Sequence, residues 1–311
     1  MHLAMSILVR DEADIIEDNI RHHAASGVSS FIVTDNGSVD GTRELLEGLS
    51  KDFDLTIIDE ESMTIDQDLW VTRMATMLRA KGDVDWVINN DADEFWISHD
   101  SSSLPDALNK SLGQNTVPAD KVGVVSCRRS NFVAASETVS KDGYYYAHNN
   151  YRVVTDWKDA AGTLELNWEE SAALLNNDKH VIIRTLPGKV ITRLAGLTSI
   201  TMGNHGAVHE LHTVNSNDIN IVHYPIRSYE QFKRKVINYG SSIEKNTRLG
   251  AQASLHLRRW YESYKLGTLE DTYNAIVLPG QLLDGLVEKG VLVKDTPAIK
   301  SAVKAVAMAA L

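Results

Sequence analysis

Short apolar runs alternate with amphipathic segments over the first hundred residues of the chain. Apolar runs bounded by charged or turn-forming residues are typical of buried strands, and they occur at residues 3–9, 31–34, 55–58 and 86–89. Between them, apolar positions recur at helical spacing over residues 14–26, 40–49 and 69–80. This order predicts an α/β fold in which a mostly parallel sheet is flanked by helices.

The remainder of the chain is less regular. Strands are expected at residues 122–126 and 151–155, and a strand pair at 181–184 and 189–193 around a Pro187-Gly188 turn. The pattern is helical from Tyr229 to Tyr264, and one or two further helices are expected after Leu269. We therefore predict one domain over residues 1–240 and a helical C-terminal extension over residues 241–311.

Charge and cysteine content narrow the classes of function. The 311 residues carry a formal net charge of −11, which repels phosphate backbones, so we expect no nucleic-acid partner. A single cysteine, Cys127, excludes an internal disulfide and a thiolate zinc cluster, which fits a cytoplasmic protein. Residues 298–311 place two lysines among apolar residues, a composition compatible with core packing, with homo-oligomer formation or with peripheral contact at the inner face of a membrane.

The most specific chemical feature follows the fourth expected strand. The sequence WVINNDADEFW brings Asp91, Asp93 and Glu94 to the carboxyl end of that strand, where open α/β sheets bind ligands. Neighbouring carboxylates repel one another unless a cation joins them, and Mn²⁺ and Mg²⁺ prefer such oxygen ligands. The simpler alternative is a solvated acidic turn. The flanking aromatic residues favour a walled ligand site over this alternative.

Two other strand ends carry charged residues. Arg10, Asp11 and Glu12 follow the first strand, and Asp35 follows the second. Because sequential parallel strands present their carboxyl ends to one edge, these side chains are expected beside Asp91. Asp35 is then placed to hold a ribose hydroxyl or a base. The alternative is a purely structural role in the turn that follows the second strand.

These segments resemble glycosyltransferase family 2, in particular the branch that is similar to the family 92 enzymes. The similarity lies in VRDEADIIEDNIRHHAASGVSSFIVTDNGSVDGT, in WVINNDADEFW as a DxD segment, and later in MGNHG and IVHYPIRSYEQFKRK. It covers residues 1–100 and 200–240. The resemblance implies a GT-A-like fold, with a Rossmann-like nucleotide-sugar-binding half at 1–100 and an acceptor half at 101–240.

The resemblance also implies roles for single residues. Glu12 and Asp35 would contact the nucleoside, Asp91 the ribose or the metal, and Asp93 would ligate Mn²⁺ or Mg²⁺ at the diphosphate. Arg10 and Arg73 are further candidates for binding the donor. A late histidine often completes such a metal site, which suggests His205 or His223; we select His223 as the ligand and leave His205 as either a ligand or a base.

A general base and cations for the diphosphate are expected in the later segments. The candidates for the base are Asp156, Glu169, Glu170, His205 and Glu210, of which we select His205, flanked by glycines, and Glu170. Arg227 begins a basic cluster that includes Lys233, Arg234 and Lys235. Arg227 is the stronger candidate for a diphosphate contact, whereas a solvated helix face explains the three later residues almost as well.

The predicted activity is transfer of a sugar from a nucleotide-diphosphate donor to a hydroxyl acceptor, a carbohydrate or glycolipid, in polysaccharide or glycoconjugate synthesis. The family resemblance implies a metal-dependent reaction with inversion. A nucleotidyltransferase acting on sugar phosphates is the first alternative, but the acidic RDEAD after the first strand lacks the glycine-rich basic loop usual there. A non-catalytic carbohydrate-binding relative is the second.

Overall fold

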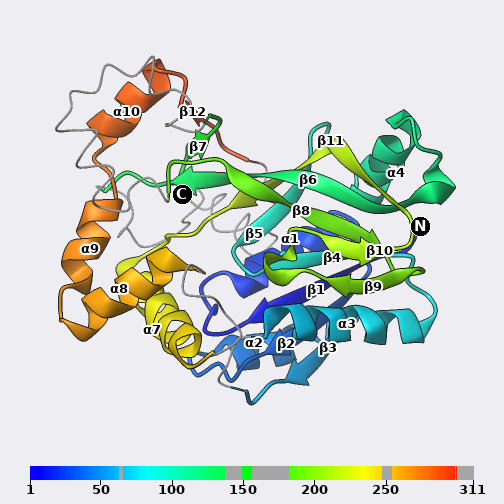
Figure 1. Ribbon diagram of the computed structural model, residues 1–311, viewed down its shortest axis with the longest axis horizontal. Helices are drawn as coiled ribbons and strands as arrows, with labels where there is room; N and C mark the ends of the chain where they lie inside the picture. Colours follow the sequence, from blue (N-terminus) through cyan, green and yellow to red (C-terminus); the bar gives the residue numbers. More distant parts are fainter. Residues whose placement is uncertain (63–65, 137–148, 156–181, 247–253, 298, 300–311) are drawn as a thin grey trace.

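A mixed β-sheet of ten strands runs through the protein and is flanked by helices (Figure 1). The computed structural model describes residues 1–62, 66–136, 149–155, 182–246, 254–297 and 299. The longest path through the sheet has the order β12-β7-β6-β8-β4-β1-β2-β3, and β11 pairs with β5 and β6. The predicted α/β class with a GT-A-like arrangement of sheet and helices is the one observed.

The first hundred residues form the parallel part of this sheet. Strand, helix and strand alternate as the apolar runs predict, and β3-β2-β1-β4 are parallel neighbours. The elements are β1 (Leu3–Val9), α1 (Ile16–Ala25), β2 (Ser30–Asp35), α2 (Thr42–Leu49), β3 (Leu55–Asp59), α3 (Gln67–Lys81) and β4 (Trp86–Asp91).

The second half makes the sheet mixed, so the expectation of a mostly parallel sheet holds only for the first half. β4 pairs antiparallel with β8, and β8 pairs antiparallel with β6, while β6 and β11 run parallel. The elements are β5 (Glu94–Ser98), α4 (Leu104–Gln114), β6 (Val122–Val133), β7 (Tyr151–Val153), β8 (Leu186–Arg193), β9 (Leu197–Ile200), β10 (Ala207–His209) and β11 (His212–His223).

The predicted strand pair around Pro187-Gly188 is wrong. Residues 182–184 form a turn and a bend, and Pro187 and Gly188 both lie inside β8. A Cβ on Gly188 would lie 2.4 Å from the carbonyl oxygen of Cys127 in β6. The glycine therefore serves the close approach of two strands, and not the turn that a Pro-Gly pair usually indicates.

Helices bury both faces of the parallel strands. Leu3, Met5 and Ile7 of β1 belong to a core shared with α1, and Ala4 points into a second core with Val71 of α3. A strand that is covered on both faces reads as a continuous apolar run, which is why β1 shows no alternation of apolar and polar residues. The carboxyl ends of the strands are left as the polar edge.

A third core joins the C-terminal helices to the end of the sheet. α7 (Tyr229–Lys245), α8 (Leu255–Lys265), α9 (Leu269–Ile276) and α10 (Gly280–Glu288) share it with β7 and β12 (Leu292–Lys294). The predicted boundary at residue 240 falls inside α7, and the extension returns a strand to the main sheet. The division into domains stays a prediction. Over the described ranges, no helix combines the length and the apolar character needed to cross a membrane.

A buried histidine pair fixes α1 against β5. His23 is fully buried, its Nδ1 lies 2.7 Å from the carbonyl oxygen of Asn19, and its Nε2 accepts the backbone N–H of Trp96 at 3.0 Å. An acceptor nitrogen carries no proton, so this ring is neutral in the fold. Burial, together with neighbouring His22, lowers the pKa of His23 well below its ordinary value.

Acid is therefore expected to weaken the fold through His23. Its folded pKa lies below the unfolded value of about 6.5, so the unfolded chain takes up a proton first as the pH falls below that value. Above about pH 6.5, His23 adds no pH dependence to the free energy of unfolding. Below that pH, the free energy of unfolding falls by up to about 1.4 kcal/mol per pH unit. Urea denaturation of the protein and of His23→Gln between pH 7.5 and 5 measures this. Equal slopes in the two proteins would contradict the assignment.

Candidate active site

The carboxyl ends of β1, β2 and β4 meet at one edge of the sheet, as the sequence predicts. In the parallel register Val9 is opposite Asp35, and Leu8 is opposite Asp91. Asp35 is buried, and its Oδ1 accepts the backbone N–H of Ser38 at 3.0 Å. Asp35 therefore closes its own turn with one oxygen, while its Oδ2 lies 3.9 Å from Arg43.

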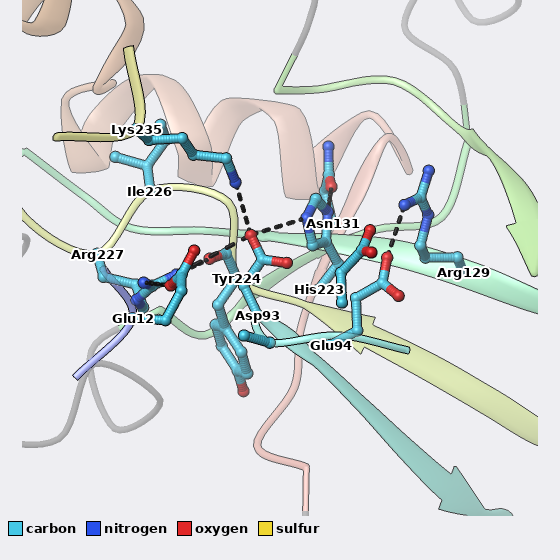
Figure 2. A network of polar contacts seen from close by, with 12 residues as sticks. Glu12, Asp93, Glu94, Arg129, Asn131, His223, Tyr224, Ile226, Arg227 and Lys235 are labelled. Atoms are coloured by element: carbon cyan, nitrogen blue, oxygen red, sulfur yellow. Dashed lines mark hydrogen bonds and ion pairs between the residues drawn. The ribbon is translucent and has the colours of Figure 1, made fainter. Parts of the chain in front are cut away.

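Asp93 is the centre of a buried polar network (Figure 2). Its Oδ2 lies 2.7 Å from Nζ of Lys235, 3.4 Å from Nε2 of His223 and 3.9 Å from Nη1 of Arg227. Burial alone would raise the pKa of Asp93, but these neighbours hold it well below the ordinary value. Asp93 is thus a carboxylate that stays ionised although it is buried.

His223 is oriented by Asn131. The register of β11 places His223 opposite Glu94 of β5 and Asn131 of β6. The Asn131 amide nitrogen donates to the carbonyl oxygen of Ile182 at 2.9 Å, so its Oδ1 faces Nδ1 of His223 at 2.7 Å and accepts a hydrogen bond from that nitrogen. Nε2 is then left facing Asp93. Two lone pairs oppose each other there unless a proton or a metal ion lies between them.

A buried arginine ties the end of β1 to the loop after β11. Arg227 contacts Glu12 at 2.5 Å and Asp14 at 2.7 Å, and it also donates to the carbonyl oxygen of Tyr224. Burial raises the pKa of Glu12 to about 7, against the opposing effect of Arg227. Glu12 and Arg227, both predicted to bind the donor, therefore lie together and form an ion pair with each other.

A second network holds the other two carboxylates of the cluster. Lys189 of β8 is fully buried and contacts both Asp91 and, at 2.9 Å, Glu94. Arg129 of β6 lies 2.6 Å from Glu94. Burial would raise the pKa of Glu94, but Lys189 and Arg129 lower it. The sequence reasoning missed both cations, and the only local signal for Lys189 is its place in a predicted strand directly before Val190 and Ile191.

The remaining predicted residues are distributed around these networks. His205 places Nδ1 2.8 Å from the carbonyl oxygen of Gly188, and burial, with Arg129 and Lys189 adding to it, lowers the pKa of His205. Arg73 is 41% exposed and contacts Glu60 at 3.1 Å, and the backbone N–H of Glu60 donates to the carbonyl oxygen of Asp35. Arg10 lines a small cavity together with Asn36, Trp70 and Tyr239. The base candidates Asp156, Glu169 and Glu170 lie outside the described residues.

A divalent ion fits the Asp93–His223 pair. Ligand atoms about 2.1 Å from an octahedral ion lie about 3 Å apart, close to the 3.4 Å between Oδ2 and Nε2. A hydrogen-bonded second ring nitrogen, as Asn131 provides, is typical of histidine ligands. Among the described residues no three His, Cys, Asp or Glu side chains gather as ligands, and Asp91 turns to Lys189 instead. Further ligands would come from water or from donor phosphates.

The fold and this edge define the class of protein. Helices cover a parallel half-sheet whose strand ends carry acidic residues, and a mixed second half closes over them, which is the GT-A arrangement of glycosyltransferases. Residues 3–264 match the sequence model of glycosyltransferase family 92, so the chain belongs to that family. It is a glycosyltransferase. The family 92 part of the sequence resemblance is confirmed, whereas membership of family 2 is not.

Two solved structures are distantly similar. Residues 1–349 of S. aureus TarS, in complex with UDP, match 92% of this chain and 83% of that chain with 13% identity and a TM-score of 0.37. Glucosyl-3-phosphoglycerate synthase from Mycobacterium tuberculosis, in complex with Mn²⁺, UDP and glucosyl-3-phosphoglycerate, matches 64% of this chain and 59% of that chain with 16% identity and a TM-score of 0.32. No curated protein sequence matches the chain.

The buried network around Lys189 is expected to be structural. Lys189→Met leaves the buried Glu94 with Arg129 alone, and breaking a buried pair costs about 3–5 kcal/mol in the free energy of unfolding. Adding Glu94→Gln should restore part of this loss, because the uncompensated charge is removed. Lys121→Met, at an exposed ion pair, is the matched control and should change it by less than about 1 kcal/mol. Urea denaturation measures all four proteins, and a small loss in Lys189→Met would refute the role.

Proposed function

We propose that this enzyme transfers a sugar, with inversion, from a nucleotide-diphosphate donor to a hydroxyl group of a carbohydrate or glycolipid acceptor, and that it needs Mn²⁺ or Mg²⁺. The observation that carries the proposal is the pair Asp93–His223, in which a buried carboxylate oxygen and a ring nitrogen lie 3.4 Å apart, a spacing that fits two ligands of one divalent ion. Family membership supports sugar transfer. The cytoplasmic location and a role in polysaccharide synthesis, both expected from the sequence, belong to the same proposal.

The donor is assigned to the edge at β1, β2 and β4. We assign the nucleoside to Asp35, Glu12 and Arg10, because the register brings the ends of β1 and β2 together. Asp93 and His223 would hold the metal, whose charge would offset that of the departing diphosphate. Asp91, predicted as a further ligand or ribose contact, is assigned to the ribose, and Arg227 adds a cation beside Asp93.

His205 is the proposed general base. Its Nδ1 donates to Gly188, which leaves Nε2 as the acceptor, and its lowered pKa keeps the ring neutral near pH 7. A neutral imidazole can take the proton of the acceptor hydroxyl as that oxygen attacks the anomeric carbon. Glu170 is the second candidate for this role, from the sequence.

Product analysis separates the proposed activity from its alternatives. With several nucleotide sugars and Mn²⁺, a glycosyltransferase releases nucleoside diphosphate, and a nucleotidyltransferase releases pyrophosphate or monophosphate products. A non-catalytic relative releases neither. Release of pyrophosphate, or of no product with any donor, would refute the proposal.

Asp93→Asn tests the metal assignment. The change removes one charge from the proposed site while preserving size, so activity should fall by about two orders of magnitude or more. The fold should remain, because Lys235 and Arg227 keep other carboxylate partners nearby in Glu12 and Asp14. Nucleoside diphosphate release with and without EDTA measures the effect. Full turnover in EDTA would exclude a metal-dependent reaction, and full turnover of the variant would exclude Asp93 as a metal ligand.

Replacing His223 and His205 by alanine, one at a time, should have different effects on metal affinity and on turnover. Loss of a metal ligand weakens Mn²⁺ affinity by about ten- to a hundredfold or more, judging from the effect of supporting residues alone. Loss of a general base lowers kcat by about two to four orders of magnitude with little change in metal affinity. We expect the first result for His223→Ala and the second for His205→Ala. If neither quantity changes in either variant, both histidines are structural.

A further inference from the structure

Lys235 occupies the space beside the proposed metal ligand. Its ammonium group lies 2.7 Å from Oδ2 of Asp93, the same oxygen that Nε2 of His223 faces at 3.4 Å (Figure 2). Its side chain is 23% exposed, and Asp93 is its ion-pair partner. The described protein therefore already has a full positive charge where a divalent ion would bind.

Helix α7 brings a second side chain to the same edge. Asn238, one turn after Lys235, donates to Oδ2 of Asp11 at 2.7 Å. Positions i and i+3 lie on one face of a helix, so this face of α7 closes over the end of β1 and over the turn after β4. The small cavity that remains beside Asn238 and Tyr239 has a volume of about 10 Å³, which is about the room for one water molecule.

A divalent ion at Asp93 and the Lys235 contact compete for the same oxygen atom. A divalent ion at Asp93 would meet the ammonium group of Lys235 at the same oxygen, and like charges at that distance repel strongly where water is scarce. A diphosphate changes this balance, because its oxygens accept hydrogen bonds from an ammonium group and also ligate the metal. The ammonium can then leave Asp93 for the phosphate.

We propose that Lys235 is a donor-binding residue that exchanges partners: without donor it is the counter-ion of Asp93, and with donor it pairs with the diphosphate. The inference rests on the proposed function, because it takes Asp93 as a metal ligand. It has two consequences of opposite sign. Lys235 weakens the binding of a divalent ion alone, and it strengthens the binding of a nucleoside diphosphate.

Calorimetric titration of the full chain tests both consequences. The probes are MnCl₂ alone, and uridine and guanosine diphosphates and monophosphates in EDTA. Lys235→Met should bind Mn²⁺ alone about tenfold more tightly than the wild type, because the competing charge is gone. It should bind the preferred diphosphate about ten- to a hundredfold more weakly, and lose less with the monophosphate. Lys235→Arg, which retains the charge, should keep diphosphate affinity within a few-fold of the wild type.

Lys245→Met is the matched control, because Lys245 is exposed at the end of the same helix. It should behave as the wild type with every probe. A Lys235→Met variant that binds both Mn²⁺ and diphosphate more weakly, or both unchanged, would overturn the exchange while the proposed function stands. A wild-type protein that binds no nucleoside diphosphate, either in EDTA or with saturating MnCl₂, would overturn the proposed function, and this inference with it.

Discussion

Repulsion between carboxylates at one edge of the sheet is the constraint on which the rest of the site depends. The parallel strands of the first half carry acidic side chains to the same edge, and several of these are buried. Buried charges of one sign are stable only with partners. The second half of the chain supplies those partners from β6, β8, the loop after β11 and α7, namely Arg129, Lys189, Arg227 and Lys235.

The mixed sheet is what brings these cations to the edge. β8 lies antiparallel between β4 and β6, so Lys189 reaches Asp91 across 98 residues of sequence. β11 lies between β5 and β6 and places His223 between Glu94 and Asn131. A wholly parallel sheet would bring only further strand ends to this edge. An antiparallel strand such as β8 runs in the opposite direction, so it brings side chains from its beginning, such as Lys189, to the same edge.

The sequence predicts the strand ends well and their partners poorly, for a physical reason. Apolar runs and turn residues are local signals, and they located Asp35, Asp91 and Asp93 correctly at one edge. The partner of a buried carboxylate is a tertiary contact, so a lysine such as Lys189 is visible only as a charged residue in a predicted strand. Gly188 is a second example of a tertiary constraint. The close approach of β6 requires a glycine at this position, and the neighbouring residues in the sequence give no sign of that approach. Arg73 contacts Glu60 next to the end of β2, and its assignment to the donor stays a prediction.

The two charge networks differ in what anchors their cations. Glu94 is held by Arg129 and Lys189, which both extend from central strands, so their positions are fixed by the sheet. Asp93 is held by Arg227 and Lys235, which extend from a loop and a helix outside it. The strand pairing therefore does not fix the positions of Arg227 and Lys235. α7 shares its core with α8, α9 and α10, so the C-terminal helices determine where the Lys235 ammonium can reach. Those helices therefore contribute to the geometry of this edge of the sheet.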